Sequence, residues 1–338
     1  MTGRSTERWL AWVPSVLLAT LCTLAWLPAS ALAHGGSIGG SRQQLTVPTW
    51  LVLVTGGAAV GASFLLASLV TDRSLVRAID DWRGGIPRVG VPALETVGRV
   101  FLQVAGLGAL GLTVVGGVLG LPSPLGNVAI LLVWVGWWAG YTATTYLVGN
   151  TWPAVNPWRT IATVLPSLGV DYPARFGSWP AVAGLAGLVW VEIANPVAAD
   201  PTLLVGLVLA YTTVTLAGAV VFGEGVWFGR ADPVARVFRY YGHVAPVGYR
   251  DGNLSVRLPG AGLHTLDLSG RGEVAFAVAL VWLTTFDGLV TTPAWRSLAT
   301  LLVDAGFPAA LLYPGGLLAG LALFYGVYRL ASRASRRT

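Results

Sequence analysis

The chain is a series of apolar blocks of roughly 18 to 24 residues, separated by shorter polar segments. A helix needs about 20 such residues to cross about 30 Å of hydrocarbon at about 1.5 Å per residue. Strands of an outer-membrane barrel would be half as long and would alternate apolar and polar positions. The blocks therefore predict an all-α membrane protein with seven spanning helices, at 48–70, 98–121, 127–148, 180–196, 202–223, 274–292 and 310–329.

A further apolar run precedes these blocks and has the features of an export signal. Two arginines lie before it, and the segment "ASALA" after it fits the small-x-small rule for signal cleavage. The pattern predicts a signal peptide at 1–33 and an exported glycine-rich leader at 34–47. Because the run is longer than a usual signal core, an uncleaved signal anchor is the alternative.

Composition supports the membrane class, since 54% of residues are hydrophobic, 11% are charged and the mean hydropathy is +0.68. The basic residues are all arginines, and all but Arg42 and Arg296 fall in segments that the helix count places in the cytoplasm. This predicts a multi-pass protein of the plasma membrane with its mature N-terminus outside and its C-terminus cytoplasmic. The net charge of +6 follows the membrane flanks, which disfavours nucleic-acid binding.

The predicted cytoplasmic loop 224–273 carries two local patterns of its own. In "DPVARVFRYYG", Asp232 can cap a helix whose apolar positions lie opposite Arg236 and Arg239, which predicts an interfacial helix. The stretches "NLSVRL" and "LHTLDL" alternate around "PGAG" and predict a small β-hairpin. This loop separates the first five helices, in 48–223, from the last two and the basic tail, in 274–338.

Two acids, Glu192 and Asp287, lie well inside predicted helices and at similar depth in the membrane. A carboxyl group there costs roughly 2.5 to 3.5 kcal/mol on insertion scales, so it needs a partner, water or the bundle interior. One interpretation is a shared proton or cation site, or an acid–base pair. The other is that each carboxyl only bonds a nearby hydroxyl or a broken helix end. The hydroxyl partners expected on the third and fifth helices are Tyr141, Thr145, Tyr211 and Thr215.

Two weaker candidates lie outside the bilayer centre. At the inner end of the third helix, Asn156, Trp158 and Arg159 could bind a headgroup or an anionic substrate, or could serve only as turn and interface anchors. His34 at the mature N-terminus could bind copper through its amine and imidazole, although such a site needs further ligands. The sequence identifies no other metal site and no cofactor, and it lacks the common hydrolase, metalloprotease and nucleotide motifs.

Several stretches between residues 34 and 295 resemble a family of polytopic membrane proteins commonly labelled fenitrothion hydrolase. They are "AHGG", "NPWRTIATVL", "YPARFGSWPAVAGLAGLVWVE", "ADPTLLVGLVLAYTTVTLAG" and "TFDGLVTTPAW". The resemblance implies hydrolysis of organophosphate-type esters, for which a metal-activated water would be expected. Family members continue with further histidine-containing helices, so the chain resembles a C-terminally shortened member. The resemblance assigns no catalytic role to Glu192 or Asp287.

Three functional hypotheses remain open at this point. The first is a membrane protein that handles a small solute, a cation or a proton through an intramembrane carboxylate site. The second is a membrane-embedded hydrolase, which the resemblance implies. The third is a non-catalytic subunit of a membrane complex, with the loop 224–273 docking a membrane protein partner.

Overall fold

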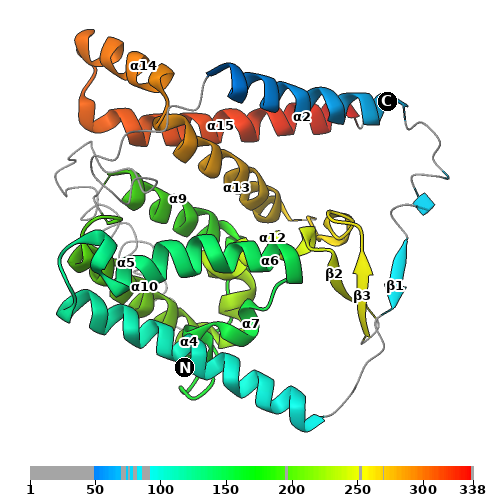
Figure 1. Ribbon diagram of the computed structural model, residues 1–338, viewed down its shortest axis with the longest axis vertical. Coiled ribbons are helices and arrows are strands. Elements are labelled where there is room, and N and C mark those ends of the chain that lie inside the picture. The colour runs from blue at the N-terminus through cyan, green and yellow to red at the C-terminus, as the bar shows by residue number, and fades with distance from the viewer. Residues whose placement is uncertain are drawn as a thin grey trace, which may run out of the picture.

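The computed structural model is mostly helical and carries one small sheet (Figure 1). It describes residues 49–69, 74, 77–78, 82–85, 92–194, 197–250, 253–268 and 270–335. The expected signal segment, the exported leader and His34 lie outside the described residues.

Each of the seven apolar blocks contains a helix. Their bounds are α2 Thr49–Leu69, α4 Pro92–Leu119, the continuous α5–η2–α6 segment Val128–Val148, α9 Trp179–Ala194, α10 Pro201–Phe222, α13 Arg271–Val290 and α15 Ala309–Ser335. Within the described residues, five of these are long and apolar enough to cross a membrane, namely α4, α5–η2–α6, α10, α13 and α15. The apolar part of α2 and the whole of α9 are shorter.

The outer surface of these helices is apolar. Phe64 on α2, Phe101 and Leu119 on α4, and Leu330 on α15 expose between 66% and 79% of their area. Large apolar side chains this exposed along several helices match the hydrocarbon of a bilayer better than water. The surface and the helix lengths together indicate a membrane protein.

The helices form two packed groups. Helix α13 lies between α9 and α15 (Figure 1), and the indole N–H of Trp282 on α13 donates to the Leu317 carbonyl of α15 at 2.8 Å. Helix α4 packs against α10, α5 and the short helices α7 and α8 in the second group. The remaining elements are α7 Trp152–Val155, α8 Pro157–Ala162, α11 Glu224–Val226, η4 Trp227–Ala231, α12 Pro233–Val244, α14 Pro293–Asp304 and the single turns η1 Pro124–Gly126, η3 Ala174–Phe176 and η5 Leu263–Thr265.

Helix α12 joins the two groups instead of lying on the surface. Its Val237 packs in the cluster formed with α9 and α13, whereas Phe238 packs with Trp152 and Trp158 of the other cluster. The expectation that Arg236 would lie on an exposed polar face is wrong, because its side chain is 1% exposed. Neighbouring helices α6, α7 and α9 cover α12 from several sides, so an amphipathic pattern does not place it at the surface.

The small sheet is antiparallel, in the order β1 (Arg83–Gly85), β3 (Asn253–Arg257), β2 (Val247–Arg250). The expected strand at β3 exists, but its predicted partner "LHTLDL" is wrong, since Leu263–Thr265 forms a 3₁₀ turn. Strand β3 pairs instead with β2, where Arg250 faces Asn253 across a two-residue Asp-Gly connection in the sequence. Asp-Gly is the stronger short-range hairpin signal.

Candidate functional site

A partly open cavity of about 210 Å³ lies among α4, the α5–η2–α6 segment, α7, α8, α9, α10 and α12. Its walls are almost wholly aliphatic and aromatic. Among the described residues that line it, Glu192 is the only one with a charged side chain. A pocket with an apolar wall and few polar groups is the usual form of a small-molecule site.

The aromatic wall depends on an unusual helical segment, η2, from Leu131 to Tyr141. Its i→i+5 hydrogen bonding widens the helix and brings Trp134, Trp137 and Trp138 to the cavity. The ring of Trp137 lies 5.9 Å from that of Trp152, which in turn lies 5.0 Å from the ring of Phe238 on α12. These rings were not among the residues expected at a site, although Trp134, Trp137 and Trp138 form a run of tryptophans inside a predicted span.

Three of these tryptophans carry unused hydrogen-bond donors. Within the described part of the chain, the buried indole N–H groups of Trp134, Trp137 and Trp152 have no acceptor. Trp158, in contrast, donates to the Thr212 hydroxyl at 2.7 Å. A buried N–H group without an acceptor costs about 1–3 kcal/mol.

Glu192 lies near the end of α9 and borders this cavity. No residue in the described ranges donates a hydrogen bond to its carboxyl group or forms an ion pair with it. Asp287 of α13 is half-buried and close enough to repel Glu192 electrostatically, but it does not line the cavity. The structure therefore brings the two expected acids near each other and places one of them at the cavity.

The four hydroxyl residues expected beside these acids have other partners. The Tyr141 hydroxyl shares a hydrogen bond of 2.8 Å with Thr151, and the Thr145 hydroxyl donates to the Tyr141 carbonyl at 3.0 Å. On α10, Tyr211 and Thr215 both donate to one carboxylate oxygen of Asp232, at 2.5 and 3.4 Å. Of the four, Tyr211 also lines the cavity.

Asp232 is a second buried carboxyl group near the site, and the sequence pattern predicted it only as a helix cap. It is fully buried and does cap α12, accepting from the Ala235 N–H at 2.7 Å. Burial raises its pKa to about 6, and the hydrogen bonds from Tyr211, Ala235, Thr215 and Val234 oppose that shift. The cluster of hydroxyls in "YTTVT", which includes Tyr211 and Thr215, was the signal in the sequence that a buried acceptor lies nearby.

The raised pKa of Asp232 predicts a specific dependence of stability on pH. The folded chain binds this proton more tightly than the unfolded chain, so the contribution to stability is full below pH 3.8 and is lost as the pH rises through about 6. The Asp232→Asn variant has no titrating group at this position. It therefore lacks this loss in the free energy of unfolding, which is on the order of 2–3 kcal/mol. The melting temperature of the wild type relative to the variant should fall between about pH 4 and 6 and then level off. A difference in melting temperature between wild type and variant that stays constant from about pH 4 to 8 would contradict the raised pKa of Asp232.

The inner-interface candidates do not form one site. Asn156 caps α8 by accepting from the Arg159 N–H at 3.1 Å, and Arg159 pairs with Glu224 at 2.9 Å. Trp158 instead lines the cavity. The charge of Arg159 is thus compensated within the chain, and Trp158 belongs with the aromatic wall.

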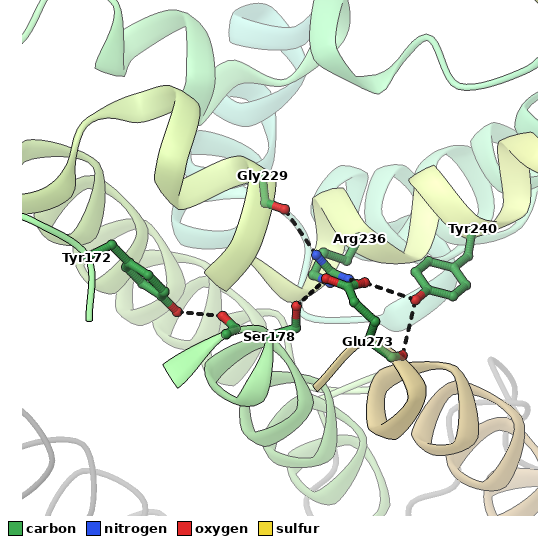
Figure 2. A network of polar contacts seen from close by, with 7 residues as sticks. Tyr172, Ser178, Gly229, Arg236, Tyr240 and Glu273 are labelled. Atoms are coloured by element: carbon green, nitrogen blue, oxygen red, sulfur yellow. Dashed lines mark hydrogen bonds and ion pairs between the residues drawn. The ribbon is translucent and has the colours of Figure 1, made fainter. Parts of the chain in front are cut away.

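A network of polar contacts fastens α12 to α13 beside this region (Figure 2). The buried Arg236 forms an ion pair with Glu273, and its guanidinium donates to the Gly229 carbonyl at 3.0 Å. The Glu273 carboxylate also accepts from Ser178 at 2.6 Å and from Tyr240 at 3.2 Å. Both carboxylate oxygens of Glu273 therefore accept from groups within the chain, which favours a structural role for this pair.

Comparisons with family models, with curated proteins and with solved structures found no match to this chain. Within the described residues, no group of three or more histidine, cysteine, aspartate or glutamate side chains could hold a metal ion.

Proposed function

We propose that this chain is a multi-pass protein of the plasma membrane that holds a small solute or cation in its aromatic cavity, with Glu192 as the exchangeable charge. The observation that carries the proposal is the position of Glu192 as the charged residue of an otherwise apolar cavity. Seven crossings, with the mature N-terminus outside and the C-terminus cytoplasmic, are part of the proposal. The helix found in each of the seven apolar blocks, five of them long enough to span among the described residues, and the arginine distribution support this orientation.

The chemistry of such a site follows from its surroundings. An ionised carboxylate in apolar surroundings is costly unless a counter-charge is present. Two arginines on helices that border the cavity, Arg159 on α8 and Arg236 on α12, already pair with Glu224 and Glu273. A proton or a bound cation is then left to neutralise Glu192, and exchange between the two would couple solute movement to proton movement.

A vesicle experiment tests this function. We expect that, in proteoliposomes, at least one solute from a panel of small amines, amino acids and inorganic cations drives proton flux. Glu192→Gln keeps the shape of the side chain and should abolish the flux. The matched control is Asp304→Asn, which removes an exposed acid at the end of α14. Flux that survives in Glu192→Gln, or that Asp304→Asn also abolishes, would count against the proposal.

A membrane-embedded hydrolase is the second candidate, and the resemblance to the fenitrothion hydrolase family favours it. Under that proposal the cavity would receive the apolar part of an ester. The same purified protein, assayed with an organophosphate ester with and without added divalent metal, separates the two functions. Metal-dependent turnover without proton flux would favour the hydrolase.

A further inference from the structure

We infer that the ligand of the cavity is a small organic cation, an amine or quaternary ammonium compound, which replaces a proton on Glu192. This inference rests on the proposed function and names its substrate class. Three properties of the cavity support it: its charge, the nature of its wall and its size.

The described wall of the cavity carries charge of one sign, which is negative. Glu192 supplies a negative group, and among the described residues no lining side chain is basic. Asp287 adds a second negative charge close by. A cationic ligand therefore meets a group of the opposite sign in the described wall of the cavity, whereas an anionic ligand would be repelled.

The wall suits an organic cation better than a metal ion. Hard cations such as Mg²⁺ and Ca²⁺ take about six or more oxygen ligands. Besides Glu192, the lining offers the hydroxyls of Thr113 and Tyr211, which donate to the Ala109 carbonyl and to Asp232. Aromatic rings, in contrast, attract alkylammonium groups through their faces, with tryptophan the strongest. Five tryptophans line this cavity, together with Tyr211 and Phe238: Trp134, Trp137, Trp138, Trp152 and Trp158.

The size of the cavity limits the ligand. An apolar cavity of about 150 Å³ accommodates benzene, and this one measures about 210 Å³. The volume suits a compound on the order of ten non-hydrogen atoms, such as a phenyl ring that carries a trimethylammonium group.

The exchange balances in atoms and charge. In the empty site the Glu192 carboxyl group carries a proton, because no described group compensates its charge. When the cation binds, the O–H bond breaks, the proton passes to water and the carboxylate pairs with the cation. One proton leaves for each cation that enters, so the apparent affinity for the cation rises with pH while the empty site is protonated.

An isosteric pair of probes tests the inference directly. Phenyltrimethylammonium and tert-butylbenzene have the same shape and differ in charge. Binding to the full chain in lipid nanodiscs is measured by calorimetry in two buffers of different ionisation enthalpy, which also reports proton release. We expect the cation to bind at least about tenfold more tightly than the neutral probe, with release of close to one proton. In Glu192→Gln the cation should lose at least about tenfold in affinity and release no proton, whereas the neutral probe should change little. Asp304→Asn should behave as the wild type.

The outcomes separate this inference from the proposed function. Equal binding of both probes, or cation binding without proton release in the wild type, overturns the cation class and leaves a cavity for neutral solutes. Unchanged affinity for the cationic probe in Glu192→Gln also overturns the inference that the ligand is an organic cation. If neither probe binds the wild type, the inference fails, whereas the proposed function fails only if no solute of the vesicle panel drives proton flux. Proton release by the wild type is informative even if Glu192→Gln does not fold.

Discussion

Replacing Glu273 with alanine is expected to destabilise the protein by about 3–5 kcal/mol, because it leaves Arg236 buried without its counter-charge. The Arg236 side chain is 1% exposed, so water cannot replace the lost carboxylate. The same change removes the acceptor of the Ser178 hydroxyl and the side-chain acceptor of the Tyr240 hydroxyl, which keeps the backbone carbonyl of residue 273 as its other acceptor. A large drop in melting temperature in detergent should follow.

Two comparisons show whether burial of the charge causes this loss. The double variant Arg236→Met, Glu273→Leu removes both charges and should recover much of the stability, since a buried pair is often replaceable by apolar residues. The pair of Arg159 and Glu224 has side chains about a third exposed, at 32% and 34%, so Glu224→Ala should cost only about 0–1 kcal/mol. A double variant as unstable as Glu273→Ala alone would argue against this explanation.

The helices were the part of the fold that the sequence predicted best. Hydropathy depends on local composition, and each of the seven apolar blocks does contain a helix. The depth of α12 could not be predicted in the same way. Its pattern is strongly amphipathic, but the partner that allows Arg236 to be buried, Glu273, lies 37 residues away in the sequence. Only the tertiary structure brings the two together.

The candidate site was predicted in part. Glu192 stood out because a carboxyl group in an apolar helix is costly, a property of the local sequence. Its cavity could not be anticipated, because it is assembled from helices far apart in the chain, including the wide turns of η2. The hydroxyls of Tyr211 and Thr215 were expected to serve the membrane acids. They bind Asp232 instead, since α12 begins beside α10.

The sheet shows a similar limit. Strand β3 was expected from its alternating pattern, but β1 lies about 170 residues earlier and is only three residues long, too short for a periodic signal. The choice between two neighbouring strands as the partner of β3 depended on turn chemistry. The Asp-Gly pair favoured β2.

Among the glycine-to-alanine substitutions on α4, Gly106→Ala is expected to disturb the cavity most. A Cβ atom at residue 106 would lie 1.8 Å from the backbone carbonyl oxygen of Val155. A backbone atom cannot rotate away as a side chain can, so α4 and α7 would have to separate. Overpacking of this kind costs about 1–3 kcal/mol or more. Because both Gly106 and Val155 line the cavity, ligand binding should weaken together with the melting temperature.

Gly108→Ala provides the matched control on the same helix. A Cβ atom at residue 108 meets nothing within 4 Å, and alanine favours a helix over glycine by up to about 1 kcal/mol. This variant should melt at or slightly above the wild-type temperature and should bind the cationic probe normally. If the two variants melted alike, the close contact between α4 and α7 would be wrong. A shift of α4 relative to Val155 changes the shape of the cavity itself. If Gly106→Ala lost stability but kept full affinity for the probe, the ligand would therefore have to bind away from this wall.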